Sequence, residues 1–292
     1  MKNSCLLFRP FNVGGCFELK LHNGKTVLID PFFPEDGRPE SAKEDSILAC
    51  DYILLTHTHF DHDMHVGYFV KKFNPKVIVQ ASAAIEEMIF HQIPIDNIIP
   101  IHHGQEFELD GLQIQGFMTK HASFGLRKYD PNRDITYQKF GLEGHKRADV
   151  FGDIECVNYL LTLDNGFTMA IVSGTDFSAD IRRKVADHHV DLLLRQFGMR
   201  KNMVTTGETL EKVNFDSQIT PEEFANVIAQ YHAQIMMPFH FENTLKRWGE
   251  EKLRAYLNDA SEIMRQIYPG GAILYPEAYR WYQVGLDVTP VK

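Results

Sequence analysis

Short apolar runs separated by turn residues dominate the first part of the chain, a pattern typical of β-strands. Runs of strand length occur at residues 16–21, 26–29, 52–55 and 77–79. The turn His22-Asn23-Gly24-Lys25 separates the first two. Helical patterns follow the last two, at residues 64–73 and 81–91. The pattern therefore predicts strands and turns first, and alternating strands and helices afterwards.

The second half has clearer boundary signals. Residues 107–119 contain two strands around the turn Asp110-Gly111, and residues 157–172 contain two more around Asp164-Asn165-Gly166, which is a hairpin signal. A capping box from Thr220 to Glu223, with Pro221 at the first helical position, marks a helix start. The other expected elements are helices at 178–188, 220–232 and 244–267 and strands at 190–194 and 235–237.

Three polar segments interrupt these elements, at residues 34–46, 122–155 and 196–218. The segment 122–155 is charged, contains recurring glycines and follows no strand or helix period, so we expect an arm inserted in the domain. The order of elements favours an α/β (α+β) protein, a mixed sheet sandwich with helices on its outer faces. We expect residues 1–292 to form one domain, because no low-complexity linker divides them.

The composition and net charge limit the kinds of molecule that the chain is expected to bind. The 292 residues are 44% hydrophobic and 24% charged, which is ordinary for a globular protein, and the formal net charge is −9. That charge disfavours nucleic acid and anionic membranes as partners, while a small-molecule substrate, including an anionic one, stays open. The cysteines Cys5, Cys16, Cys50 and Cys156 form no CxxC pair, so free thiols in a reducing compartment are expected.

No targeting or membrane segment is expected. The apolar run near the start ends at Arg9-Pro10 and is too short for the core of a signal peptide. No stretch approaches the roughly 18 apolar residues of a membrane span. We therefore expect a cytoplasmic protein, and the sequence specifies no oligomeric state.

Candidate metal ligands are concentrated in Thr56-His57-Thr58-His59-Phe60-Asp61-His62, directly after the strand 52–55. Three histidines and one aspartate within six residues are hard to explain as chance. Residues i and i+2 of an extended chain point the same way, so His57 and His59 can meet one ion. Asp61 and His62 follow at the turn into a helix and can face a second ion. Imidazole nitrogens and carboxylate oxygens suit zinc, manganese or iron.

This HxHxDH segment resembles the signature of the metallo-β-lactamase superfamily. The resemblance implies a four-layer αββα sandwich, with a metal site at one edge of its two sheets and further ligands at later strand ends. Residues of the expected types follow in the expected order: His121, Asp176 and His240. The chain has Gly174-Thr175-Asp176 where the superfamily commonly has Gly-Asp-Thr.

The resemblance implies a role for each residue. The implied metal ligands are His57, His59 and His121 for one ion, Asp61, His62 and His240 for the other, and Asp176 between them. Asp30, in Leu28-Ile29-Asp30-Pro31, would accept hydrogen bonds that orient the metal-binding segment. Zinc is the first expectation for both ions, with manganese and iron as alternatives.

The implied activity is metal-dependent hydrolysis. Two divalent ions about 3.5–4 Å apart lower the pKa of a shared water and position it as a bridging hydroxide. Asp61 is the expected catalytic residue, since its carboxylate can accept a hydrogen bond from that hydroxide and aim it at a carbonyl carbon or a phosphorus. The ions stabilise the developing oxyanion. The expected substrate is a small ester, lactone or phosphodiester.

Asp30-Pro31, the helix start at Thr220 and the ending Pro238-Phe239-His240 resemble one branch of the superfamily. That branch contains the ascorbate-6-phosphate lactonase-like and N-acyl phosphatidylethanolamine phospholipase D-like proteins. A nuclease acting on RNA is an alternative, because tRNA-processing enzymes share these ligands, although the charge of −9 does not favour RNA. A metal-binding protein without catalysis is a further alternative.

Substrate contacts are expected from the polar segments 122–155 and 195–218. The first is locally basic and follows His121 directly, so it is either a solvated loop or a cover that supplies cations to an anionic substrate. Its candidate substrate-binding residues are Arg127, Lys128, Arg133 and His145. The pairs His102-His103 and His188-His189 are expected to lie on the surface without a metal role.

Overall fold

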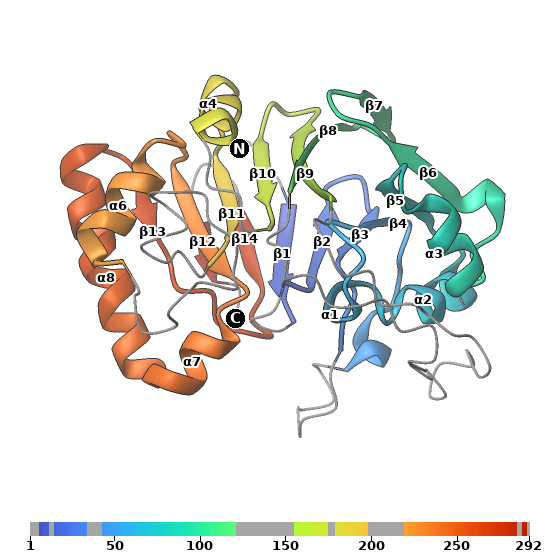
Figure 1. Ribbon diagram of the computed structural model, residues 1–292, viewed down its shortest axis with the longest axis horizontal. Helices are drawn as coiled ribbons and strands as arrows, with labels where there is room; N and C mark the ends of the chain where they lie inside the picture. The colour runs from blue at the N-terminus through green and yellow to red at the C-terminus, as the bar shows by residue number, and fades with distance from the viewer. Residues whose placement is uncertain are drawn as a thin grey trace, which may run out of the picture. The chain divides into compact units, whose positions relative to one another are not determined.

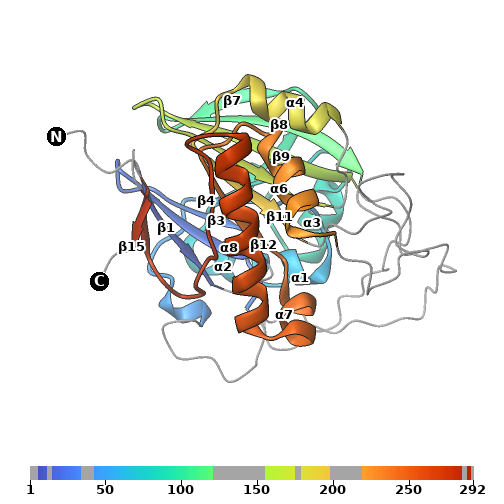
Figure 2. The same ribbon diagram turned by 90° about the vertical axis from the view of Figure 1, so that its left-hand side faces the viewer.

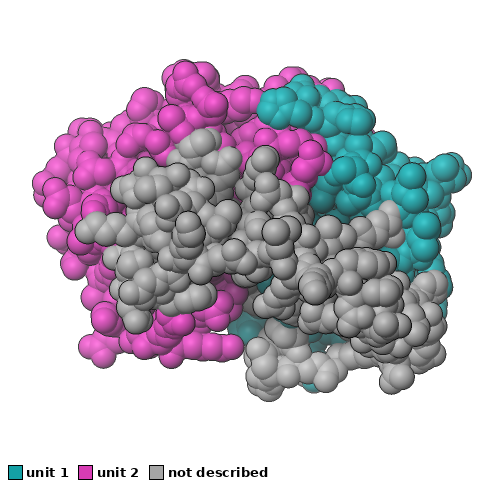
Figure 3. Space-filling model, in the orientation of Figure 1, with its two compact units in different colours: residues 1–105, 127–151, 277–292 teal, residues 106–126, 152–276 magenta. Residues whose placement is uncertain are grey.

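The computed structural model describes residues 6–11, 15–33, 43–120, 155–174, 179–197, 219–284 and 288–290 (Figure 1, Figure 2). Contacts divide the chain into two compact units (Figure 3). Unit 1 comprises residues 1–105, 127–151 and 277–292, and unit 2 comprises residues 106–126 and 152–276. Each unit contains one sheet with helices of its own. The single domain with an arm at about 122–155 stays a prediction, and residues 121–154 lie outside the described residues.

Unit 1 is built on an eight-stranded sheet in the order β15-β14-β1-β2-β3-β4-β5-β6. The strands are β1 (Leu6–Pro10), β2 (Phe17–Leu21), β3 (Thr26–Ile29), β4 (Tyr52–Leu54), β5 (Lys76–Gln80), β6 (Ile98–Ile101), β14 (Tyr282–Val284) and β15 (Val288–Pro290). From β15 to β3 the neighbours are antiparallel, and from β3 to β6 they are parallel. Residues that follow β3 and β4 therefore lie at the same edge of the sheet.

Among the described residues of unit 1, three helices accompany the parallel strands: α1 (Phe60–Asp63), α2 (Val66–Phe73) and α3 (Ala84–Phe90). Short 3₁₀ turns are η2 (Glu44–Ser46) and η3 (Ile95–Asn97). The helix expected at 64–73 begins two residues later. It ends where expected, because Asn74 adopts a left-handed φ of 55°. Val66 and Phe69 of α2 share an apolar core with Ile53 and Val77 of the sheet.

Unit 2 is built on a seven-stranded sheet in the order β13-β12-β11-β10-β9-β8-β7. The strands are β7 (Glu106–Leu109), β8 (Leu112–Lys120), β9 (Glu155–Leu163), β10 (Thr168–Val172), β11 (Leu192–Gln196), β12 (Ile235–Phe239) and β13 (Ala272–Ile273). Strands β7 to β10 pair antiparallel, and β10 to β13 pair parallel. The hairpins expected at 107–119 and 157–172 are confirmed.

The helices of unit 2 are α4 (Ala179–Asp187), α6 (Pro221–Ala229), α7 (Glu242–Trp248) and α8 (Glu250–Ile267). Figure 1 shows α6 beside α8, which pack against each other. The capping box is confirmed, because the Glu223 amide donates to the Thr220 hydroxyl oxygen and the Thr220 amide donates to Glu223. The single helix expected at 244–267 is wrong. Gly249, with φ 78° and ψ 162°, breaks it into α7 and α8.

Both units share one local design. In unit 1, Asp51 precedes β4 and accepts a hydrogen bond from the amide of Thr26, the first residue of β3, at 2.9 Å. In unit 2, Asp191 precedes β11 and accepts one from the amide of Thr168, the first residue of β10, at 2.8 Å. In each case the aspartate amide donates back to the threonine carbonyl. A hairpin followed by a parallel strand is thus fixed in the same register twice.

The α/β class is confirmed, since each unit has a mixed sheet with helices. Strand β6 (Ile98–Ile101), which contains Pro100, is not among the strands expected from the sequence. It lies at the edge of the sheet, where a missing amide donor is tolerated. None of the helices in the described ranges combines the length and apolarity that crossing a membrane requires.

Candidate metal centre

The histidine-rich segment begins where β4 ends and leads into α1. Leu55 still follows the sheet, since its amide donates to the carbonyl of Ile78 at 3.0 Å. Because β3 and β4 are parallel, Asp30 after β3 and Thr56 after β4 lie at the same sheet edge. Asp30 has a φ of 44°. Such a backbone conformation is uncommon outside glycine and often marks a functional position.

Asp30 organises this edge through three hydrogen bonds. Its Oδ1 accepts from the Thr56 amide at 2.7 Å, and its Oδ2 accepts from the Thr56 hydroxyl at 2.6 Å. Oδ2 also accepts from Nδ1 of His62 at 2.8 Å. Asp30 is only 1% exposed, so these bonds form out of reach of water. One buried carboxylate therefore ties together the two ends of the segment 56–62.

The same hydrogen bonds determine which nitrogen each imidazole offers to a metal. The Thr56 hydroxyl gives its one hydrogen to Asp30, so its oxygen accepts from Nδ1–H of His57 at 3.0 Å. His57 therefore presents Nε2. His62 also presents Nε2, because Asp30 holds its Nδ1–H. Oxygen atoms that fix the tautomer in this way commonly accompany metal-binding histidines.

The imidazoles are close enough to serve a common centre. Nε2 of His57 and Nδ1 of His59 are 3.0 Å apart, in agreement with the i, i+2 argument. The ring centroids of His57 and His62 are 3.8 Å apart. Imidazole nitrogens at these separations, with the Asp61 carboxylate beside them in the chain, fit divalent ions of the zinc class.

The electrostatics around His62 are dominated by carboxylates. Burial by itself lowers the pKa of His62. Three nearby negative charges, and the hydrogen bond to one of these groups, outweigh burial and raise this pKa to about 9; the groups are Asp30, Asp61 and Asp63. In a metal-free chain His62 is therefore protonated at neutral pH, and an ion that binds it displaces a proton. His59 and Asp61 are only partly buried, which leaves one side of the segment open.

In unit 2, His240 follows β12 and has a φ of 58°. Its Nδ1 lies 2.5 Å from Oε1 of Glu242, in the first turn of α7. As with His62, a carboxylate holds Nδ1, and Nε2 is the nitrogen left for a metal. Here the carboxylate comes from only two residues away, and the pair is partly exposed.

The end of β10 is held by three side chains. The amide of Ser173 donates to Oδ1 of Asn158 at 2.9 Å, and the amide of Gly174 donates to Oε1 of Gln196 at 2.5 Å. Nη1 of Arg195 donates to the Gly174 carbonyl at 3.1 Å. Gly174 itself needs the left-handed φ of 73° that glycine adopts without strain. These hydrogen bonds therefore fix the backbone of Ser173 and Gly174.

Two of these residues correct a prediction. Arg195 and Gln196 were expected in an irregular rim at 195–218, but they are buried at the end of β11. Their polar atoms find partners inside unit 2, such as the Val172 carbonyl for Arg195 at 3.1 Å, so neither needs solvent. Residues 198–218 lie outside the described residues.

The structure gathers part of the predicted site. Asp30, His57, His59, Asp61 and His62 lie in one stretch of unit 1, and His240 lies in unit 2. Other predicted site residues lie outside the described residues, namely His121, Arg127, Lys128, Arg133, His145 and Asp176.

Histidines and cysteines elsewhere behave as expected. The pairs His102-His103 and His188-His189 are exposed. Three of the cysteines are buried and form no disulfide, namely Cys16, Cys50 and Cys156, and burial raises the pKa of the Cys50 thiol. Cys5 lies outside the described residues.

Sequence reasoning missed a cluster of three buried ionisable residues in unit 1: Asp63, Glu87 and His91. The signal was present in the chain. Glu87 and His91 are four residues apart and so share one helix face, but residues 81–91 were interpreted only as a helix.

Comparison with known proteins gives a consistent result. Residues 13–123 match the metallo-beta-lactamase superfamily, a range that includes the segment 57–62 and His121. A UPF0173 metal-dependent hydrolase of Salinibacter ruber is 32% identical over 157 residues, which are 50% of this chain and 68% of the relative. Another, from Flavobacterium johnsoniae, is 30% identical over 165 residues, which are 54% and 68% of the two chains.

Solved structures share the fold at low sequence identity. A possible metal-dependent hydrolase from Veillonella parvula has a TM-score of 0.61 at 16% identity and covers 97% of this chain and 100% of the other. Igni18, a metallo hydrolase from Ignicoccus hospitalis, has a TM-score of 0.58 at 12% identity, covering 98% of each chain. An isothiocyanate hydrolase from Delia radicum gut bacteria has a TM-score of 0.58 at 18% identity, covering 94% and 97%. These similarities confirm the expected fold.

Proposed function

The chain belongs to the metallo-β-lactamase superfamily and is a metal-dependent hydrolase, and from this premise we propose how its site works. We propose that two divalent ions, zinc in the first place, act together in hydrolysing a small ester, lactone or phosphodiester. The observation that carries this proposal is the network in which Asp30 holds Thr56 and His62 while Thr56 holds His57.

That network favours metal binding over a purely structural role. It fixes two neighbouring imidazoles with Nδ1 occupied, so that both offer Nε2 as a ligand. A buried histidine with a purely structural role needs only a hydrogen-bond partner and no second imidazole beside it. Here the ring centroids of His57 and His62 are 3.8 Å apart. His240, with Nδ1 held by Glu242, supports the same reading from unit 2.

The proposed ligands are divided between two ions. The first is assigned to His57, His59 and His121, the second to Asp61, His62 and His240, and Asp176 to both. Gln196 and Arg195 hold the backbone of Gly174, which precedes Asp176 by two residues in the sequence. The ions, when bound, lower the pKa of a shared water and stabilise negative charge on the substrate.

Asp61 is the proposed catalytic residue of this chain. Its side chain is only partly buried, unlike those of His57 and His62. It can therefore reach both the ion and the open side of the segment, where it accepts a hydrogen bond from the attacking water and orients it. Basic residues of the arm 122–155, namely Arg127, Lys128, Arg133 and His145, are proposed to meet an anionic part of the substrate.

The test combines metal analysis with a substrate panel. Purified protein is expected to contain at least two first-row divalent ions per chain by plasma mass spectrometry. The panel covers lactones, esters, phosphodiesters and phospholipids, together with isothiocyanates because a protein of the same fold hydrolyses that class. Activity on one of these classes that disappears with chelation and returns with zinc is the expected result.

Two outcomes of this test would replace the proposed function with another. Cleavage of structured RNA, with no small substrate cleaved, replaces the proposal with a nuclease. Stoichiometric metal with no turnover on any class replaces it with a metal-binding protein. Full metal content and full activity in His59→Ala or Asp61→Ala would overturn the ligand assignment itself.

A further inference from the structure

A second group of candidate ligands is buried where helices α1 and α3 of unit 1 come together. Asp63 is the last residue of α1, Glu87 lies within α3, and His91 follows α3 as its C-cap. The side chains of all three have no exposed surface. Glu87 and His91 lie on the same face, one turn apart, and the His91 amide donates to the Glu87 carbonyl at 3.0 Å.

Distances within the cluster are close to those between ligand atoms of one ion. Nε2 of His91 lies 3.3 Å from Oε2 of Glu87 and 3.7 Å from Oδ2 of Asp63. One ligand atom from each residue lies within 4.8 Å of the others. Bonds of about 2.0–2.2 Å in a tetrahedron place two ligand atoms roughly 3.3–3.6 Å apart. A hydrogen bond from N–H to oxygen is shorter, at about 2.7–3.2 Å.

His91 is the residue that separates this cluster from an ordinary ion pair. Within the described part of the chain, neither of its ring nitrogens makes a hydrogen bond, although the ring is enclosed. Its position is fixed from the other side by α2, where a Cβ on Gly67 would stand 3.1 Å from the His91 carbonyl oxygen and 3.5 Å from Nδ1. Nε2 therefore faces the two carboxylates, in the position of a ligand.

The chemical types of the side chains lead to the same conclusion. Two carboxylates and one imidazole are buried together in unit 1. A divalent cation attracts both carboxylates and accepts the electron pair of an imidazole nitrogen. Two oxygen donors and one nitrogen donor suit zinc, manganese or iron(II).

We propose that Asp63, Glu87 and His91 bind one divalent cation of the zinc class, separate from the ions assigned to the segment 57–62. The cation joins α1 to α3 and is enclosed, so its role is structural. Asp63 is two residues beyond Asp61, and the ion therefore secures the helical turn that carries Asp61 and His62. The inference does not depend on hydrolysis, because an enclosed ion of this kind binds whether or not the chain is catalytic.

The direct test is anomalous scattering from crystals of the wild-type chain grown with zinc and measured on both sides of the zinc absorption edge. A peak about 2.0–2.2 Å from Oδ of Asp63, Oε of Glu87 and Nε2 of His91 is the expected result. A zinc-loaded crystal with no peak at this position would overturn the proposal.

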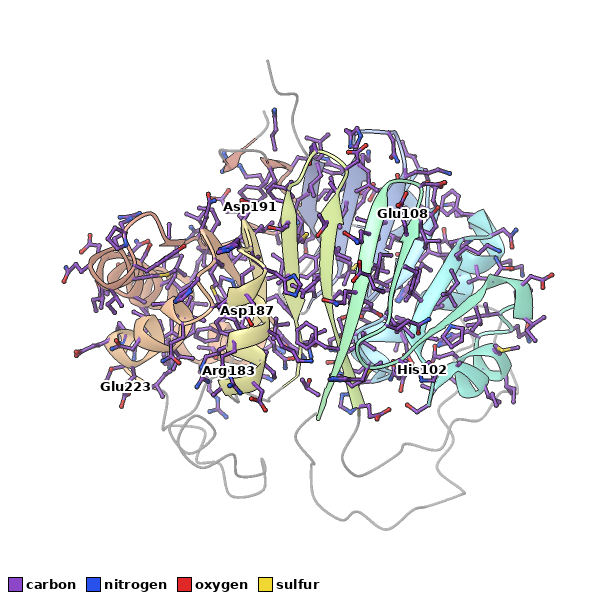
Figure 4. The ribbon with its side chains drawn as sticks, turned by 90° about the horizontal axis from the view of Figure 1, so that it is seen from above. His102, Glu108, Arg183, Asp187, Asp191 and Glu223 are labelled. Atoms are coloured by element: carbon purple, nitrogen blue, oxygen red, sulfur yellow. The ribbon has the colours of Figure 1, made fainter. Side chains whose placement is uncertain are left out.

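Variants give a second, independent reading. Glu87→Gln and His91→Gln are expected to contain one ion per chain fewer than the wild type after dialysis, measured by plasma mass spectrometry. The matched controls His102→Gln and Glu108→Gln change exposed residues and should keep the wild-type content (Figure 4). Unchanged metal content in both cluster variants would also overturn the proposal. If neither cluster variant folds, the wild-type crystals decide.

Discussion

In both units a side chain accepts hydrogen bonds that fix the end of the first parallel strand, but the strand that supplies the accepting side chain differs. In unit 1 the side chain of Asp30, after β3, accepts hydrogen bonds from Thr56, which follows the neighbouring strand. In unit 2 the side chain of Gln196, on the neighbouring strand β11, accepts a hydrogen bond from Gly174, which follows β10. The hairpin and strand around these positions have the same register in both units.

The difference lies in the charge of the acceptor. Asp30 is a buried carboxylate, so besides fixing the backbone it holds the imidazole of His62 directly and that of His57 through Thr56. Gln196 is a neutral amide, and in the described part of the chain its side chain holds the turn at Ser173 and Gly174. The same local design thus positions a series of metal ligands in unit 1 and a short backbone turn in unit 2. Substitutions at these positions in unit 1 should therefore reduce activity, metal affinity and stability more than the corresponding substitutions in unit 2.

The largest effect is expected from Asp61→Asn, which removes the carboxylate proposed to orient the attacking water while preserving the shape of the side chain. Activity on the substrate found in the panel should fall about 10²–10⁴-fold, because a positioned side chain that hydrogen-bonds to the reacting water usually contributes that much. Asp96→Asn, at an exposed site of the same unit, is the control and should keep full activity. An Asp61→Asn enzyme with wild-type kcat would refute the assignment.

Asp30→Asn should follow in size, because the amide cannot accept from both Thr56 and His62 without losing a charge-assisted bond. Metal affinity is expected to fall about 10–100-fold, and the free energy of unfolding of the metal-free chain by about 3–5 kcal/mol. Isothermal titration with zinc and denaturant unfolding measure the two effects. Asp51→Asn is the control. It also removes a carboxylate that accepts a backbone amide, so it should lower stability without changing metal affinity.

Gln196→Leu tests the corresponding position in unit 2. It leaves the Gly174 amide without its buried acceptor, which should cost about 1–3 kcal/mol of unfolding free energy. If the turn also positions Asp176, metal content should fall as well. Gln234→Leu, which removes an exposed bond to Asp191, should change neither quantity appreciably. Loss of more stability in Gln196→Leu than in Asp30→Asn would reverse the ranking of the two units.

The smallest effect is expected from Glu242→Gln. The pair with His240 is partly exposed and the amide oxygen still accepts a hydrogen bond, so zinc affinity should fall about 10-fold, the lower end of the usual range. Glu250→Gln, in the first turn of α8 and paired with Arg254, is the matched control and should bind zinc like the wild type. A Glu242→Gln loss larger than that of Asp30→Asn would contradict the comparison.

Much of the fold follows from local signals. The capping box at Thr220, the hairpin turn before β10 and the stop at Asn74 depend on residues within a few positions, and each is found where expected. The errors occur at a glycine and at a proline. Gly249 divides a run that is otherwise helical in pattern. Pro100 lies in a strand because β6 is at an edge of its sheet.

By itself, the sequence determined the metal-binding segment and its resemblance to a superfamily, because four of the proposed ligands lie within six consecutive residues and their types are chemically restricted. Only the tertiary structure decided what orients them. Asp30 reaches Thr56 and His62 because β3 and β4 are parallel neighbours, a relation between residues 26 positions apart or more. The pairing of Asp63 with Glu87 and His91 also depends on how α1 meets α3. Hydrogen bonds and ligand distances depend on proximity in space, which no local pattern records.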